Sequence, residues 1–312
     1  MIEIEHLSKR FDGVTVVDDV SLSIGDGEIV VIVGTSGSGK TTVLRMINRL
    51  IEADGGRVLI DGQDTRGVPA YQLRRQIGYA IQGHGLFPHR TVGQNIATVP
   101  SLLGWNRAKI GARVDELLTL FQLDPASYRE RLPGALSGGQ QQRVGVARAL
   151  AAAPKVLLMD EPFGALDPII RAKAQADLRA IQRRLKTTIV LVTHDMNEAI
   201  ALGDRIAVMD QGRLLQYARP DELVVSPATE FVGELLGSGE RPFRLLSFRQ
   251  VRDFIEPGEA SGAPIADTTT LRDALEEALW TGRDAVPVAN AEGQILGRVT
   301  MQTVIRQAAR HR

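Results

Sequence analysis

The sequence predicts an α/β protein built on a doubly wound parallel sheet, with a helical insertion and a small C-terminal α+β unit. Short apolar runs alternate with stretches of helical periodicity, which is the pattern of buried parallel strands joined by crossover helices. One of these runs ends in a glycine-rich turn that leads directly into a helix. The composition then changes at residues 237–240, where Gly-Ser-Gly-Glu separates the two parts.

The first part of the chain supplies the strands of the predicted sheet. Residues Ile2 to Leu7 and Val14 to Leu22 have β patterns. Ile29 to Val33 is apolar on both faces, as expected of a strand inside a parallel sheet. Further strands are predicted at 77–81, 156–159 and 189–192, and helices at 40–50, 168–185 and 196–202.

A helical insertion and a C-terminal unit complete the predicted architecture. Apolar residues recur at spacings of three and four between about residues 90 and 153, which indicates helices. In the C-terminal unit, Thr270 precedes one apolar helical face, residues 286–299 are typical of a hairpin, and a last helix follows. The pattern is βαββα-like, so we expect domains at residues 1–237 and 238–312.

The composition excludes several classes of protein. Lys+Arg and Asp+Glu both number 37, and this neutral balance argues against a protein held mainly by nucleic-acid phosphates. The absence of cysteine rules out disulfides and thiolate metal sites. The N-terminus lacks the features of a signal peptide, and no apolar run approaches the roughly 20 residues that span a bilayer. Any membrane role is therefore expected to come through a partner.

Residues Gly34 to Thr41 fit the phosphate-binding pattern G-x-x-x-x-G-K-[ST] in the strand–loop–helix context that it needs. The glycines let several backbone N–H groups face one phosphate chain, and the following helix adds its positive end. Lys40 would reach the β- and γ-phosphates, and the Thr41 hydroxyl would bind Mg²⁺. The alternative is a glycine-rich turn without a ligand, although a chance match in a chain of this length is about one per cent. The nucleotide-binding residues expected in this P-loop are Gly34, Ser36, Gly37, Ser38, Gly39, Lys40, Thr41 and Thr42.

Asp160 and Glu161 directly follow the predicted strand at 156–159. Successive residues at a strand end point to opposite sides, so the two carboxylates can have different roles. Asp160 suits a Mg²⁺ ion beside the P-loop, and Glu161 suits a general base for a water in line with the γ-phosphate. The alternative is that Asp-Glu-Pro is only a polar strand terminus.

His194 and Gln82 follow two other predicted strands and should reach the same edge of the sheet. His194 is expected to contact the γ-phosphate or to orient Glu161, and Gln82 to sense Mg²⁺ and the attacking water. The alternative for His194 is a structural histidine. A separate metal site at His84 and His89 lacks a third ligand.

Leu136 to Gln140 is a second small-residue turn, placed before a helix that is predicted from Gln140 to Ala153. The backbone N–H groups at such a helix start have no partner within the helix, and they suit an anion. Two phosphate-type sites in one chain raise the question of whether both serve the same nucleotide.

Taken in order, these motifs resemble those of the ATP-binding-cassette (ABC) ATPases over about residues 1–237. The motifs are Gly34–Thr42, Gln82, Leu136–Gln140, Met159–Glu161, Leu166–Asp167 and His194. The resemblance implies a P-loop NTPase fold in which two cassettes enclose two ATP molecules head to tail. The P-loop of one copy would then face Ser137, Gly138 and Gly139 of the other, followed by Gln140. It further implies that Asp167 lies near the interface and that Phe11 stacks on adenine, with Val16 beside it.

Within this family the chain is similar to the ATPase subunits of importers for osmoprotectants such as glycine betaine, choline and proline betaine. The segments that carry this resemblance are 85–89, 95–97, 100–105, 244–247 and the C-terminal unit. It implies ATP and Mg²⁺ as cofactors, two transmembrane permease subunits, an external solute-binding protein, and a peripheral place on the cytoplasmic face of the plasma membrane. The alternatives are a non-transport ABC ATPase and an importer ATPase for another small solute, such as an amino acid.

Residues 249–308 are similar to one CBS motif. Because such motifs usually pair, the partner would come from a second subunit. Adenosine-binding versions often have an Asp three residues after the Thr of the final strand, whereas here the residue three positions after Thr300 is Thr303. A structural or dimerising role is therefore expected. The arginines of stretch 241–252 suggest either a basic face near an anionic membrane or a solvated surface.

Overall fold

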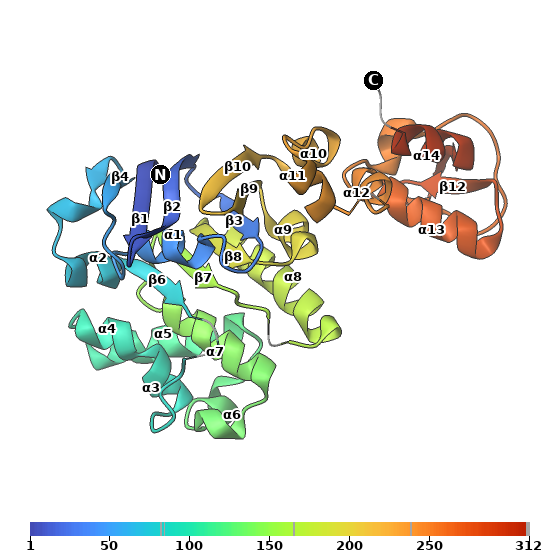
Figure 1. Ribbon diagram of the computed structural model, residues 1–312. Coiled ribbons are helices and arrows are strands. Elements are labelled where there is room, and N and C mark those ends of the chain that lie inside the picture. Colours follow the sequence, from blue (N-terminus) through green and yellow to red (C-terminus); the bar gives the residue numbers. More distant parts are fainter. Residues whose placement is uncertain (82, 84, 165, 238, 310–312) are drawn as a thin grey trace. The chain divides into compact units, whose positions relative to one another are not determined.

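The computed structural model describes residues 1–81, 83, 85–164, 166–237 and 239–309. The chain separates into two compact units, Met1–Pro220 and Asp221–Arg312 (Figure 1). The domain boundary predicted from composition, after residue 237, stays a prediction, since compactness alone does not define a functional domain.

The first unit is built on a central sheet with the strand order β10-β9-β3-β8-β7-β6. The strands β9, β3, β8, β7 and β6 run parallel, and β10 pairs antiparallel with β9. The predicted strands are confirmed, and β3, β7 and β8 are buried along their whole length. The strands are β3 (Ile29–Gly34), β6 (Ile77–Ala80), β7 (Val156–Asp160), β8 (Thr188–Thr193), β9 (Arg205–Asp210) and β10 (Arg213–Ala218).

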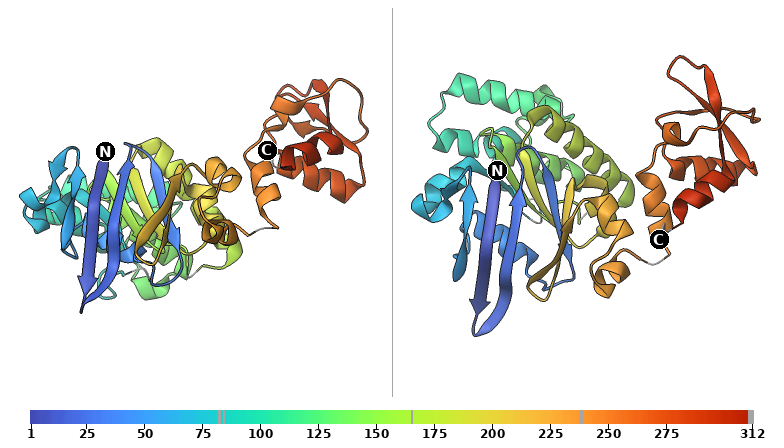
Figure 2. Two further views of the ribbon diagram at one scale, coloured as in Figure 1. Left: turned by 45° about the horizontal axis from the view of Figure 1, so that its top comes forward. Right: turned by 90° about the horizontal axis from the view of Figure 1, so that it is seen from above.

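A second, antiparallel sheet has the order β2-β1-β4-β5. Figure 2 shows its two long strands, β1 and β2, side by side in blue. One apolar core joins this sheet to the central sheet through α1, and Ile4, Leu44 and Ile32 represent the three elements in it. The elements are β1 (Ile2–Phe11), β2 (Val14–Ile24), β4 (Gly55–Ile60), β5 (Gln63–Asp64), α1 (Lys40–Ile47), the 3₁₀ turn η1 (Thr65–Gly67) and α2 (Ala70–Gln76).

The predicted helical stretch at about 90–153 is confirmed, and it is divided into short helices by side-chain caps. Thr91 and Ser137 each form a capping box with the glutamine three residues later, and Asn106 and Asp124 cap two further helices. The last of these helices, α7, packs on β6 at the end of the central sheet. The helices are α3 (Val92–Ile96), α4 (Thr98–Leu102), α5 (Arg107–Leu120), α6 (Pro125–Tyr128) and α7 (Gly138–Leu150).

The crossover helices α8 (Pro168–Leu185) and α9 (Met196–Leu202) follow β7 and β8. Asp167 caps α8 by accepting a hydrogen bond from the Ile170 N–H, and a proline occupies the first turn. Asp195 caps α9 in the same way, by accepting from Asn197 and Glu198. In the part of the chain that the structure describes, no helix combines the length and apolar character needed to cross a bilayer.

The second unit contains the predicted βαββα arrangement. Thr270 caps the first of its longer helices by accepting from the Asp273 N–H, as predicted. Arg244 is only 8% exposed and Arg241 donates to the Val224 carbonyl, so the arginines of 241–252 do not form one exposed basic face. The elements are α10 (Pro220–Val225), α11 (Glu230–Leu235), α12 (Arg241–Ser247), η3 (Val251–Phe254), β11 (Ile265–Ala266), α13 (Leu271–Thr281), β12 (Ala285–Ala289), β13 (Ile295–Thr300) and α14 (Met301–Ala308).

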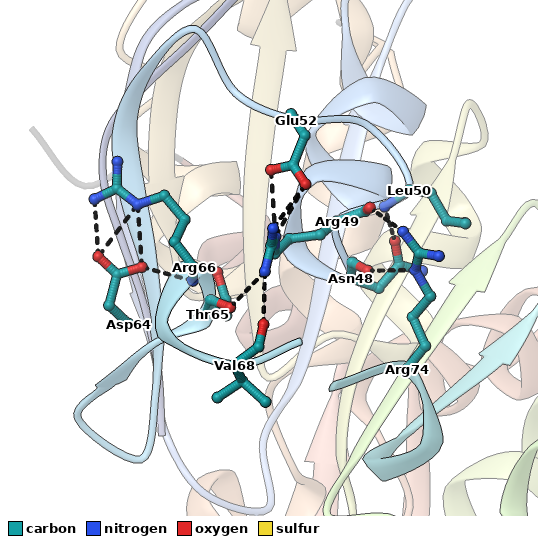
Figure 3. A network of polar contacts seen from close by, with 9 residues as sticks. All are labelled: Asn48, Arg49, Leu50, Glu52, Asp64, Thr65, Arg66, Val68 and Arg74. Atoms are coloured by element: carbon teal, nitrogen blue, oxygen red, sulfur yellow. Dashed lines mark hydrogen bonds and ion pairs between the residues drawn. The ribbon is translucent and has the colours of Figure 1, made fainter. Parts of the chain in front are cut away.

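A network of arginine side chains closes the C-terminal end of α1 (Figure 3). Arg49 donates to the carbonyls of Thr65 and Val68 at 3.0 and 2.7 Å. Arg74 donates to the Asn48 carbonyl at 3.2 Å and also to the Arg49 carbonyl. Cations stabilise this end of a helix because its last carbonyls lack partners within the helix and carry partial negative charge. The network therefore fixes α1 to η1 and α2.

We expect Arg49→Ala to lower the free energy of unfolding by about 1–3 kcal/mol, because it leaves two partly buried carbonyls without a charged donor. Arg66→Ala is the matched control from the same network, since Arg66 is 57% exposed and pairs with Asp64 two residues away. Its effect should stay within about 0.5 kcal/mol. Urea titration measures both variants, and equal losses would contradict the role given to Arg49.

Candidate functional site

The loop between β3 and α1 has a shape that only glycine permits at two positions. A Cβ on Gly34 would collide with the Met209 carbonyl oxygen. Gly39 has a φ of +94°, and a Cβ there would lie 2.6 Å from the Val16 carbonyl oxygen. The chain can therefore turn sharply from β3 into α1 while packing against β2 and β9.

Lys40, the first residue of α1, is 6% exposed and turns back over this loop. Its Nζ donates to the Gly34 carbonyl at 2.9 Å and to the Thr35 carbonyl at 2.6 Å. Burial lowers the pKa of Lys40, and the carboxylates of Glu161 and Asp160 partly offset this effect. The arrangement holds a buried amine at the point where an anion bound by the loop would meet it.

Thr41 and Asp160 are brought together from α1 and the end of β7. The Thr41 hydroxyl donates to Asp160 Oδ1 at 2.9 Å, and the carboxylate is 2% exposed. Two oxygen ligands in contact suit a hard divalent cation such as Mg²⁺, which usually keeps waters and substrate phosphates as its other ligands. Among the described residues, no group of three or more His, Cys, Asp or Glu side chains gathers as a metal cage.

Two neighbours of Asp160 were missed by the sequence analysis. Tyr79 on β6 donates to Asp160 Oδ2 at 3.5 Å, and an Arg45 guanidinium nitrogen lies 3.6 Å from the same oxygen. Burial raises the pKa of Tyr79. Arg45 could have been found, because it follows Thr41 by four residues and so shares its helix face. The contact of Tyr79 with Asp160 could not have been found, because it depends on the pairing of β6 with β7, which the sequence does not specify.

Glu161 and His194 form the second pair at this edge of the sheet. His194 Nδ1 lies 3.2 Å from Glu161 Oε1. Glu161 has a φ of +45°, and its N–H donates to the Val192 carbonyl at 2.9 Å. Both side chains line a cavity of about 340 Å³, together with Gln142 of α7. A carboxylate beside an imidazole in such a cavity can accept a proton from water.

The run Leu136–Gln140 is the N-terminal cap of α7, which begins at Gly138, two residues earlier than predicted. The Ser137 N–H donates to Gln140 Oε1 at 2.9 Å, and Gln140 Nε2 donates to the Tyr128 hydroxyl at 3.0 Å. Ser137 and Gly138 are exposed. The first turn of α7 thus presents small residues and a helix N-terminus at the surface.

The remaining predicted site residues lie on two other segments. Phe11 is 41% exposed at the end of the β1–β2 hairpin, with Lys9 Nζ 5.2 Å from its ring centroid. Val16 contacts the P-loop through its carbonyl at Gly39. Asp167 is exposed at the start of α8.

Gln82 and His84 lie outside the described residues. His89 is exposed, and its ring centroid lies 6.0 Å from that of Phe87.

Comparison with known proteins agrees with this geometry. The family model described as "ABC transporter" matches residues 17–164. The glycine betaine uptake system ATP-binding protein YehX of Escherichia coli is 49% identical, over 99% of this chain and 100% of its own length. The glycine betaine/carnitine/choline transport ATP-binding protein OpuCA of Bacillus subtilis is 51% identical, over 97% of this chain and 79% of its own.

A solved structure shares the fold of the larger part of the chain. It is the dimeric, post-hydrolysis state of the ATP-binding cassette MJ0796 bound to ADP and Pi. The similarity has a TM-score of 0.62 at 32% identity and covers 70% of this chain and 99% of that one. The chain belongs to the ABC transporter family, as one of its ATP-binding, ATP-hydrolysing proteins.

Proposed function

We propose that this protein is the ATP-hydrolysing subunit of an importer for an osmoprotectant such as glycine betaine, choline or proline betaine. The observation that carries the proposal is the 49% identity with a glycine betaine uptake protein over nearly the whole length of both chains. The match includes the C-terminal unit, which the family model at residues 17–164 does not reach.

In this proposal the P-loop binds the phosphates of ATP, and each polar side chain at the sheet edge has one task. Lys40 donates to the β- and γ-phosphates, while Thr41 and Asp160 hold Mg²⁺, which neutralises phosphate charge. The 2.9 Å contact between these two oxygens supports the metal assignment. Glu161 takes the proton of the attacking water, and the 3.2 Å contact with His194 supports a role for the imidazole in orienting it. Gln82 would sense the metal and the water.

The nucleotide-binding site would be completed by a second copy of the chain. Phe11 would stack on adenine beside Val16, and the exposed Ser137 and Gly138 would bind the γ-phosphate held by the partner's P-loop. Gly139, Gln140 and Asp167 complete that face of the proposed homodimer. The support is the exposed start of α7 and a similar cassette whose solved structure is dimeric.

The proposed assembly places the cassette dimer on two permease subunits at the cytoplasmic face of the membrane, with an external solute-binding protein. Residues 249–308 would pair with the same unit of the second copy as CBS-like motifs. In the structure Thr303 and Thr300 both donate to the Glu256 carboxylate, so the position of the expected Asp is taken up by an internal contact. This favours a structural or dimerising role over nucleotide binding.

Uptake of labelled solute tests the proposed function. Deleting the gene should abolish uptake of glycine betaine, choline or proline betaine at high osmolarity, and supplying the chain should restore it. Purifying the chain from membranes should recover a permease and a solute-binding protein. If uptake of these solutes persists while that of an amino acid is lost, the importer serves another solute. If no permease is recovered, a non-transport ATPase is indicated.

Glu161→Gln should bind ATP but hydrolyse it at least about a hundredfold more slowly, because the amide cannot accept the proton of water. Equilibrium ATP binding and the release of phosphate are measured on the same preparation. Hydrolysis at the wild-type rate would exclude Glu161 as the general base.

Mixing two inactive variants tests whether the site is shared between copies. Ser137→Arg blocks the site of the partner copy, whereas Lys40→Met blocks the copy's own site. In a mixed dimer both lesions fall on one site, so the other site is intact. ATPase activity should return to about a quarter of the wild-type value, because about half of the dimers are mixed. No gain on mixing, with dimer formation confirmed, would contradict the shared site.

A further inference from the structure

Gln142 of α7 is a buried polar side chain beside the candidate general base. It is 7% exposed, and its Nε2 donates to the backbone carbonyl of Pro162, the residue that follows Glu161. Its Oε1 is buried and, as far as the structure describes the chain, has no hydrogen-bond partner. Buried polar atoms in proteins are nearly always paired, and this exception lies beside the candidate general base.

The loop after β7 is held on both sides of Glu161. The Glu161 N–H donates to the Val192 carbonyl of β8, and Gln142 donates to the carbonyl of Pro162, the residue after Glu161. Glu161 has a φ of +45°, a left-handed conformation that a non-glycine residue keeps only when its surroundings impose it. These two hydrogen bonds therefore help to define the backbone that carries the Glu161 carboxylate.

Gln142 also belongs to the helix whose first turn presents Ser137 and Gly138. An α-helix is stiff over this distance, so a displacement of its N-terminus moves Gln142 as well. Gln142, Glu161 and His194 line the same cavity of about 340 Å³. A contact made at the start of α7 can thus displace the loop that carries the general base, through α7 and the hydrogen bond from Gln142 to Pro162.

We infer that Gln142 is a positioning residue for ATP hydrolysis, which ties the Pro162 carbonyl to α7 and sets Glu161 when nucleotide engages Ser137 from a second copy. The inference rests on the roles proposed for Ser137 and Glu161. Loss of Gln142 should therefore slow turnover without weakening ATP binding, because the phosphate-binding loop is built by β3 and α1 and not by α7.

The test is Gln142→Met in the full chain, a substitution that keeps the volume and removes the amide. We expect kcat to fall about tenfold to a hundredfold, as for a misplaced catalytic group, with KM and equilibrium ATP binding within about twofold. Gln182→Met is the matched control. Gln182 is also 7% exposed, and its amide donates to the carbonyls of Gly27 and Thr187, which precede β3 and β8 at the opposite edge of the sheet. It should lower Tm and leave kcat unchanged.

Gln142→Glu is a second variant, which keeps the acceptor oxygens but has no N–H donor at neutral pH, and its kcat should fall similarly. The inference fails if either Gln142 variant turns over ATP at the wild-type rate. It also fails if kcat and ATP binding fall together, in step with Tm. Normal hydrolysis by Glu161→Gln would instead overturn the general-base role on which the inference rests, and unchanged solute uptake after gene deletion would overturn the proposed function, so these failures are distinguishable.

Discussion

The alignment of the carboxyl ends of β3, β7 and β8 is the constraint on which the rest of the structure depends. Val33 of β3 pairs with Thr193 of β8, and Asp160 of β7 pairs with Val192. The parallel register therefore brings the P-loop, both acidic residues and His194 to one edge of the sheet. A shift of one residue would turn the side chains of a strand to its other face and separate Thr41 from Asp160.

The surrounding elements hold this edge in place from several directions. α1 is held at its far end by donors from Arg49 and Arg74, so that its first turn keeps Thr41 against Asp160. The β1–β2 hairpin packs on Gly39 through the Val16 carbonyl, which joins the proposed adenine-binding residues to the phosphate-binding loop. Small residues at these contacts let backbones approach closely, and they leave little room for substitution.

β3, β6, β7 and β8 of the central sheet were predictable from their short apolar runs, whereas β9 and β10 were not predicted. β4 (Gly55–Ile60) was not predicted, since it begins with two glycines and is largely half-buried. Its fit depends on Gly56, with a φ of +75°, where a Cβ would collide with carbonyls of β1. The site residues marked by motifs were predictable, whereas Gln142 was not, because nothing along the sequence shows that its amide meets Pro162.

The contacts of Lys40 have a consequence for the free energy of phosphate binding. Its ammonium group already donates to two loop carbonyls, at 2.9 and 2.6 Å. A phosphate that binds must therefore exchange for these carbonyls, so the net free energy gained is the difference between two sets of hydrogen bonds. The same exchange, run backwards, gives the amine immediate partners when phosphate leaves. This contact therefore limits the free energy that Lys40 could contribute to holding a phosphate, and it keeps the buried amine paired in either state.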